Sequence, residues 1–196
     1  YSSTLMSVNL GWPVWLTMAV APLMTAVLAV LAGYPSLRVK GHYFAIVTLA
    51  YNMVIFIVLT TWSSLTGGEA GISNVPRPPV VAVGGFVWAL GGRVGYYYLA
   101  LIVAALATLL CALILHSRVG RVLVAIRQNE ALIEAAGVQS WRYKLFAFVV
   151  SASLAGLAGA LYAHFIGFLN PDAFGVDHSL NAILAVILGG SGTLAG

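Results

Sequence analysis

Long stretches without a charged residue are the feature that most constrains what this chain can fold into. The first charged side chain is Arg38, and the segment Gly11–Gly33 before it is predominantly apolar. A helix of about 20 mostly apolar residues crosses the hydrocarbon core of a bilayer. We therefore predict an all-α, polytopic integral membrane protein with about five transmembrane helices. They run over Gly11–Gly33, Gly41–Trp62, Gly95–Ser117, Lys144–Ala163, and from about Ser179 to the end of the chain.

The composition excludes several other classes of protein. Charged residues make up 7% of the chain, whereas soluble domains carry about 25%. The net charge of +4 does not indicate nucleic acid, because membrane proteins place Lys and Arg in their cytoplasmic loops. The single cysteine, Cys111, leaves no intrachain disulfide. The chain does not begin with Met, and we expect residues 1–196 to be a single transmembrane domain within a longer protein.

The distribution of basic residues predicts which side of the membrane each loop faces. If the spans alternate in direction, Arg77 and Arg93 fall on one side. The opposite side receives Arg38, Lys40, Arg118, Arg121, Arg127, Arg142 and Lys144. Loops rich in Lys and Arg stay in the cytoplasm. We therefore predict cytoplasmic loops over 34–40 and 118–142, with an external N-terminus and external loops over 63–94 and 164–178.

Two smaller features belong to the span ends and the external loops. The apolar stretch Val80–Leu90 is too short to cross the bilayer, and Gly84 and Gly85 interrupt it. We expect a hairpin or an interfacial segment there.

The four histidines lie at or near predicted span ends without metal-ligand spacing. We predict interfacial positions and no metal site for them: His42, His116, His164 and His178.

The segment 118–142 carries much of the charge of the chain. Its apolar residues recur at intervals of three or four, which indicates short amphipathic helices, and Gly137 is a suitable helix stop. Arg127 and Glu130 are spaced so that they could pair locally on one helix. Such a loop either docks a soluble partner protein or only sets topology and touches anionic lipid. The residues alone leave both interpretations open.

Five blocks of sequence, taken in order, resemble one family of membrane proteins. The block LRVKGHYFAIVTLA, residues 37–50, resembles the R-x-[KR]-G-x-Y-F-A-I-x-T-L-A pattern of LivM-type permeases. These are subunits of branched-chain amino-acid ABC transporters. The resemblance covers nearly all of residues 33–196 and implies a polytopic permease. The further blocks lie at 66–72, 120–130, 144–159 and 188–193.

The resemblance implies a role for the charged loop. In ABC importers, the cytoplasmic loop before a late span docks on the ATPase subunit, so segment 118–142 is expected to be the coupling loop. The chain has no G-x-x-x-x-G-K-[ST] motif. We therefore expect a transport subunit and not an enzyme, with no cofactor of its own and with ATP bound by partner subunits. The residues expected to couple are Arg121, Arg127, Asn129, Glu130 and Gly137.

The same resemblance implies an assembly in a bacterial or archaeal plasma (inner) membrane. The expected partners are membrane lipid, a second permease subunit, two ATP-binding subunits, and a periplasmic or lipid-anchored substrate-binding protein. No nucleic-acid partner is expected. In this family the outer surface must receive the binding protein, and Thr66, Gly67 and Gly68, together with 170–174, are candidates for that surface or for an outer gate. Alternatively, the glycines simply permit a turn.

Polar residues inside the spans are the candidates for a substrate path. Asn52 is the most costly to leave unpaired in lipid, so it should face protein or a water-filled path. Alternatively, Asn52 forms an interhelical hydrogen bond. No catalytic residue is predicted. The candidates for the path are Thr48, Tyr51, Asn52, Ser151, Ser153 and Asn181.

The expected function is that of a permease subunit in an ATP-driven importer for branched-chain amino acids. An importer of the same type for urea or short amides is the nearest alternative. An integral-membrane enzyme is a second alternative, but the sequence offers no convergent acid/base or metal-ligand set for it. A membrane scaffold without transport is a third.

Overall fold

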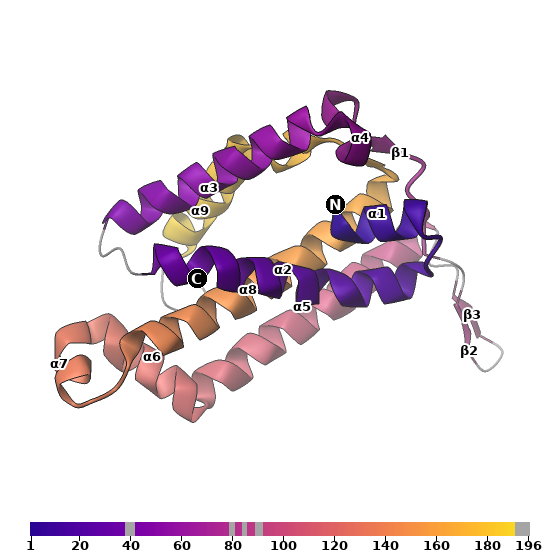
Figure 1. Cartoon of the computed structure of the whole chain (residues 1–196). Helices are drawn as coiled ribbons and strands as arrows, with labels where there is room; N and C mark the ends of the chain where they lie inside the picture. Colours follow the sequence, from indigo (N-terminus) through magenta and orange to yellow (C-terminus); the bar gives the residue numbers. More distant parts are fainter. Residues whose placement is uncertain (38–41, 79–80, 84–85, 89–91, 191–196) are drawn as a thin grey trace.

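The computed structural model describes residues 1–37, 42–78, 81–83, 86–88 and 92–190. Within these ranges the chain is predominantly helical (Figure 1). The α-helices are α1 (Ser2–Asn9), α2 (Val14–Ser36), α3 (His42–Thr61), α4 (Ser63–Thr66), α5 (Arg93–His116), α6 (Arg118–Gln128), α7 (Glu130–Ala135), α8 (Ser140–Ile166) and α9 (Val176–Gly189). The short elements are the 3-10 helices η1 (Gly68–Ala70) and η2 (Pro171–Phe174) and the strands β1 (Ile72–Ser73), β2 (Val81–Val83), β3 (Phe86–Trp88) and β4 (Phe168–Leu169).

The predicted all-α, polytopic fold is confirmed by the helices that are long and apolar enough to cross a membrane. By length and composition, α2, α5, α8 and the helical segment Pro171–Gly189 each qualify. The segments Ile46–Thr61 and Ser63–Ala70 qualify together and are bent by 77° at the break between them. By length and composition, the described residues therefore contain four candidate spans, or five if the bent pair is one span.

Helix α8 extends beyond the apolar stretch that predicted it. The prediction placed the fourth span over Lys144–Ala163, whereas α8 runs from Ser140 to Ile166. Gly167 ends α8 because its backbone adopts the left-handed conformation, with a φ of 77°. Hydrophobicity indicates which helical turns lie in lipid. The helical hydrogen bonds nevertheless continue into the flanking polar residues until a residue such as Gly167, in the left-handed conformation, ends the helix.

The helices α2 and α8 form the central pair, and α5 packs beside them (Figure 1). Small residues allow the central pair to approach closely. A Cβ atom added to Gly156 of α8 would lie 2.2 Å from Oγ1 of Thr25 of α2. Close contact of this kind is how membrane helices associate, since lipid gives them no hydrophobic driving force. The buried core comes from these three helices and comprises Val14, Met18, Ala21, Tyr96, Ala160 and Leu161.

A second layer of helices lies to one side of the central pair. Helices α3 and α9 run side by side in opposite directions (Figure 1). The side-chain amide of Asn52 on α3 donates a hydrogen bond of 2.9 Å to Ser179 Oγ on α9. The second layer is therefore held together by a polar contact that links helices distant in the sequence.

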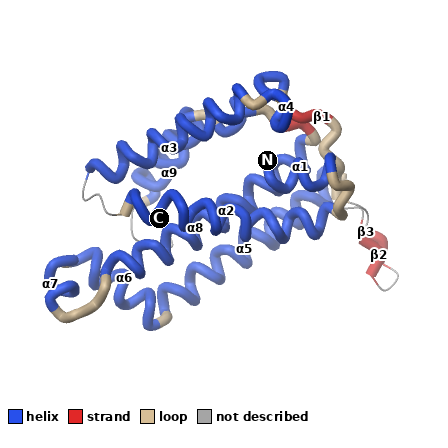
Figure 2. The backbone as a smooth tube through the Cα atoms, viewed as in Figure 1, coloured by secondary structure: helices blue, strands red, loops and turns tan. Residues whose placement is uncertain are grey.

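The connections between spans gather at two ends of the molecule (Figure 2). One end, called the hairpin end here, holds the described residues of segments 63–94 and 164–175. At this end β1 pairs with β4, and β2 pairs with β3, which confirms the hairpin predicted within Val80–Leu90. The opposite end, called the α6–α7 end, holds residues 117–139. Spans that alternate in direction produce this segregation.

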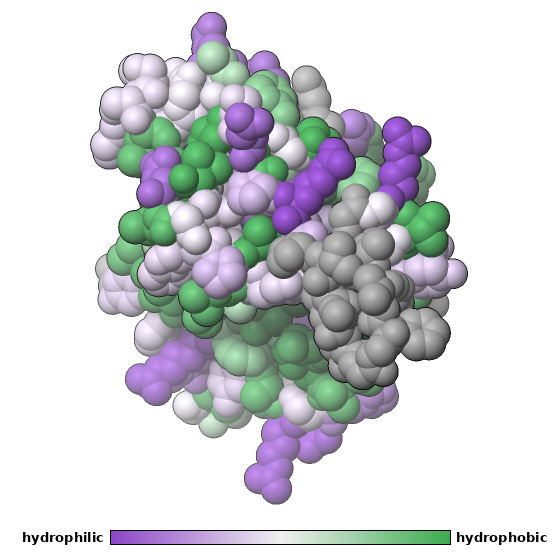
Figure 3. Space-filling model, turned by 90° about the vertical axis from the view of Figure 1, so that its right-hand side faces the viewer, coloured by the Kyte–Doolittle hydropathy of each residue, from purple (hydrophilic) through white to green (hydrophobic). Residues whose placement is uncertain are grey.

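The spans present an apolar surface. On α5, the side chains of Leu101, Leu106 and Leu113 are 50%, 58% and 64% exposed. Large exposed apolar surfaces mark contact with membrane or protein. The hairpin end is more mixed, and strongly hydrophilic residues lie on it among apolar ones (Figure 3).

Candidate functional site

A cavity of about 600 Å³ lies between the central pair and the second layer. Cavities of about 300–1,000 Å³ are typical of small-molecule sites. Helices α2, α3 and α8 supply most of its wall, and α1 and η2 reach it from the hairpin end. The lining residues are Tyr1, Ser2, Ser3, Ala21, Thr25, Leu28, Ala29, Ala32, Ser36, Thr48, Tyr51, Asn52, Ile55, Phe148, Ala152, Ala155, Gly156, Gly159, Ala160 and Phe174.

Three of the residues predicted for the substrate path lie on the wall of this cavity: Thr48, Tyr51 and Asn52. The hydrogen bond from Asn52 to Ser179 also shows that the alternative interpretation of Asn52, as an interhelical partner, is correct. The two interpretations are compatible, because Asn52 both lines the cavity and holds α3 against α9. Sequence reasoning missed Ser179, although its position at the start of a predicted span marks it as a polar residue near lipid.

The other three predicted path residues do not line the cavity. Residues 148, 152, 155, 156, 159 and 160 form the cavity face of α8, and their recurrence at intervals of three or four follows one side of a helix. Ser151 and Ser153 fall on other sides of α8, and Ser153 Oγ donates to the carbonyl of Val149 at 2.8 Å. Asn181 is exposed on α9. None of the three lines the observed cavity, and their placement on a substrate path stays a prediction.

The cavity wall is predominantly apolar and uncharged. The Thr25 hydroxyl lies 3.0 Å from the carbonyl oxygen of Pro22, and the Ser36 hydroxyl lies 2.6 Å from that of Ala32, so both are satisfied within α2. No charged residue lines the cavity in the part of the chain that the structure describes. A tyrosine phenol is neutral at neutral pH, and burial, with the nearby Asp172 carboxylate, raises the pKa of Tyr1 further, to about 12.

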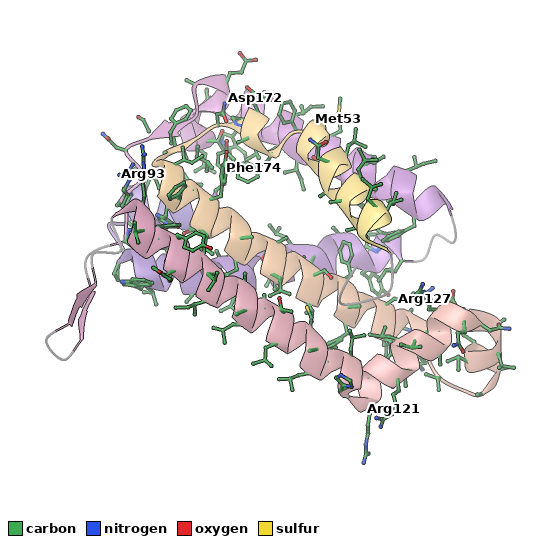
Figure 4. The ribbon with its side chains drawn as sticks, turned by 180° about the vertical axis from the view of Figure 1, so that it is seen from behind. Met53, Arg93, Arg121, Arg127, Asp172 and Phe174 are labelled. Carbon is green, nitrogen blue, oxygen red and sulfur yellow. The ribbon has the colours of Figure 1, made fainter. Side chains whose placement is uncertain are left out.

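Aromatic side chains cover the cavity at the hairpin end. Phe174 of η2 lies against Tyr162 of α8, with ring centroids 5.8 Å apart, and against Tyr1, at 6.4 Å. Figure 4 shows Phe174 and Asp172 close together at this end. Segment 170–174 was predicted as part of an outer surface or gate, and the structure places Phe174 on the cavity wall.

The remaining outer-loop candidates form a turn. Thr66 is buried, and its hydroxyl lies 2.6 Å from the carbonyl oxygen of Leu59. Gly67 and Gly68 have φ angles of 75° and 60°, which glycine adopts without strain. The turn interpretation is therefore correct for Gly67 and Gly68. A role of this loop in receiving a binding protein stays a prediction.

A buried histidine joins three segments at the hairpin end. His164 is 0% exposed, and its Nδ1 lies 2.8 Å from the carbonyl oxygen of Pro76 while its Nε2 lies 2.8 Å from Ser3 Oγ. A carbonyl only accepts, so the ring proton is assigned to Nδ1, and Nε2 accepts from the Ser3 hydroxyl. His164 is therefore buried within the protein, where α1, a helix that the sequence did not predict, contacts it; its predicted position at the membrane interface stays a prediction.

The charged segment at the α6–α7 end forms the short helices that its periodicity predicted. Asn129 ends α6 and caps α7, with its side-chain oxygen accepting from the backbone N–H of Leu132 at 3.1 Å. Gly137 follows α7 with a φ of 85°, as expected of a helix stop. Arg121 and Arg127 are exposed at this end, far from Arg93 (Figure 4). Glu130 pairs with Lys144 of α8 at 2.6 Å, a partner that the local Arg127–Glu130 hypothesis missed.

Comparison with known proteins gives one consistent family. The family model described as "Branched-chain amino acid transport system / permease component" matches residues 1–196. The chain is 32% identical to the high-affinity branched-chain amino acid permease protein LivM of Escherichia coli, over 98% of the chain and 50% of that protein. It is 29% identical to a probable LivM of Methanocaldococcus jannaschii, over 83% of the chain and 46% of that protein.

More distant relatives carry other names. The chain is 27% identical to the ribose import permease protein RbsC of Haemophilus influenzae, over 96% of the chain and 56% of that protein. The chain thus spans about half the length of the curated relatives it matches. No solved structure gives a significant match.

Proposed function

Since the chain belongs to the family of branched-chain amino acid transport permeases, we propose that it forms membrane-spanning segments of an ATP-driven importer for branched-chain amino acids. The observation that carries this proposal is the cavity of about 600 Å³ between α2, α3 and α8. It lies among helices that qualify as spans and is lined mainly by small and apolar side chains.

The lining of the cavity suits an apolar side chain in transit. Alanines and glycines of α2 and α8 leave room for a branched aliphatic group, and Thr48, Tyr51 and Asn52 offer polar contacts on one wall. No acid or base in the described lining neutralises an ammonium or carboxylate group, so these groups would keep their hydration. A site of this kind binds weakly and releases readily, and selection of the cargo then falls to a separate binding protein.

The α6–α7 end is the segment we assign to coupling. Helix α7 is exposed, and Leu132 on it is 66% exposed, which suits docking against a soluble subunit. The Glu130–Lys144 pair joins α7 to α8, and α8 lines the cavity. A partner that moves α7 on ATP binding would thereby move a wall of the cavity, as alternating access requires.

The proposed assembly places the α6–α7 end in the cytoplasm of a bacterial or archaeal cell and the hairpin end outside. It contains a second permease subunit, two ATP-binding subunits and a substrate-binding protein at the hairpin end. The family membership supports partners in general, and the distribution of Arg and Lys supports this orientation.

Urea, short amides or another neutral cargo is the second candidate. The uncharged lining of the cavity favours a neutral molecule as well as an amino-acid side chain, and a sugar permease is among the relatives. Cargo assays decide between these, because the same wall would serve either molecule.

Uptake by the whole reconstituted transporter tests the proposal. Proteoliposomes are made with the full-length subunit and its ATPases, with the binding protein added outside. They should accumulate labelled leucine when ATP is enclosed inside them, on the side of the α6–α7 end. An ATPase variant without hydrolysis is the control. If the proteoliposomes accumulate urea but not leucine, the proposed cargo is wrong. If they accumulate neither molecule although the ATPase is bound, the importer assignment is wrong.

A further inference from the structure

The two basic residues of the hairpin end line one cavity. Arg77 follows β1, and Arg93 is the first residue of α5; both line a space of about 310 Å³ together with Tyr96, Phe165 and Ile166. Lys and Arg are disfavoured in the external loops of membrane proteins. Arg77 and Arg93 are the two Lys or Arg residues of segments 63–94 and 164–178, and both lie at this one cavity.

The positive charge of this cavity has no counter-charge in the described part of the chain. Neither Arg77 nor Arg93 has a hydrogen-bond or salt-bridge partner there, and no Asp or Glu lines the cavity. The other polar groups of the wall are satisfied elsewhere. The Tyr96 hydroxyl donates to the carbonyl of Leu161, and both ring nitrogens of His164 have partners. The two guanidinium groups therefore remain available to an anion.

Apolar surface adjoins the charged groups. Phe165 and Ile166 line the cavity and are also 45% and 42% exposed on α8. On the neighbouring α5, Val94 and Tyr97 are 70% and 62% exposed. A ligand that satisfies the whole site carries an anionic group at one end and an apolar chain at the other. A free anion would leave the apolar flank uncovered.

We propose that this cavity binds the phosphate group of a phospholipid in the leaflet at the hairpin end, with Arg77 and Arg93 as its ligands. Guanidinium groups bind phosphate through paired N–H donors. The acyl chains would lie along the exposed apolar side chains of α5 and α8. This lipid site is independent of the cargo and of the coupling segment, since it shares no residue with either.

Lipid binding to the intact transporter tests the site. The complex is reconstituted in phosphatidylcholine nanodiscs containing a small fraction of labelled phosphatidylglycerol, and binding is measured for wild type, for Arg77→Gln with Arg93→Gln, and for Arg118→Gln. Arg118 is an exposed cation at the α6–α7 end, so it controls for loss of charge. Inorganic phosphate is added as a competitor in a parallel series.

We expect the double variant to lose at least tenfold in binding of phosphatidylglycerol, and Arg118→Gln and inorganic phosphate to change little. Equal binding by wild type and the double variant would overturn the site. Displacement of the lipid by inorganic phosphate at similar concentration would overturn the lipid as its ligand. An acidic side chain from another part of the assembly, seated between the two arginines in a structure of the complex, would also overturn it.

Discussion

The Glu130 carboxylate lies 2.6 Å from the Lys144 ammonium group, which ties the first residue of α7 to the beginning of α8. Both side chains are about one-third exposed, at 32% and 33%. An exposed ion pair of this kind contributes at most about 1 kcal/mol to stability. Its importance is therefore positional, because it is a direct link between the exposed helix α7 and a helix that lines the large cavity.

Removal of this link should reduce coupling more than stability. For Glu130→Gln, we expect leucine uptake per ATP hydrolysed to fall roughly fivefold, which corresponds to about 1 kcal/mol of coupling free energy, with little change in melting temperature. Uptake and hydrolysis are measured in the same proteoliposomes. The exchanged pair, Glu130→Lys with Lys144→Glu, should recover much of the ratio. An unchanged ratio in Glu130→Gln would exclude the link from coupling.

The contact between α2 and α8 should not tolerate a larger residue at Gly156. A Cβ atom there would lie 2.2 Å from Thr25 Oγ1 and 2.5 Å from Thr25 Cγ2. We expect Gly156→Ala to destabilise the subunit by about 1–3 kcal/mol, as overpacking does, and to lower the melting temperature of the purified complex. Gly159→Ala is the matched control, because its Cβ would lie 3.8 Å from the ring of Phe174. Equal melting of the two variants would contradict this account of the helix contact.

The buried hydrogen bonds of His164 should hold α1 in place. His164→Phe keeps a ring but leaves the Ser3 hydroxyl and the Pro76 carbonyl without their partner. Each buried group left unpaired costs about 1–3 kcal/mol, so hydrogen exchange should accelerate across residues 2–9 and 74–78. His116→Phe, at an exposed position on α5, is the control. Unaltered exchange at both segments in His164→Phe would show that these bonds do not hold them.

The predicted orientation can be tested by chemical labelling. In a Cys111→Ser background, a cysteine at the exposed position Gln139 should react with a membrane-impermeant reagent only from the cytoplasmic side. A cysteine at Glu69, exposed at the hairpin end, should react only from outside. Labelling of Gln139→Cys from outside would invert the topology.

Local patterns in the sequence predicted the elements of this fold well. Apolar stretches located the spans, the short interrupted stretch Val80–Leu90 predicted the hairpin of β2 and β3, and Gly137 marked the end of α7. Each of these depends on neighbouring residues alone. Helix α1 was missed because its short, Ser- and Thr-containing sequence is neither long nor apolar enough to resemble a span.

Relationships between distant residues could not be predicted in the same way. The bond between Ser3 and His164 joins residues 161 positions apart, and no periodicity indicates it. The side of α8 that faces the cavity depends on where α2 and α3 lie, so the sequence could not indicate that Ser151 and Ser153 lie off the cavity wall. Thr48, Tyr51 and Asn52 were predicted together for a substrate path because a single helix turn brings them together, and the structure places all three on the cavity wall.

The hydrogen bond between Asn52 and Ser179 should account for a measurable part of the contact between α3 and α9. Interhelical bonds of this kind contribute about 0.6 kcal/mol on average. We expect Asn52→Ala and Ser179→Ala each to destabilise the subunit, and the double variant to cost less than the sum by about that amount. The control cycle combines Asn52→Ala with Ser153→Ala, because Ser153 bonds only within α8 among the described residues. The destabilisations of these two variants should add. Additivity in the Asn52–Ser179 cycle would mean that apolar packing alone holds α3 against α9, and that this hydrogen bond does not stabilise the wall of the cavity.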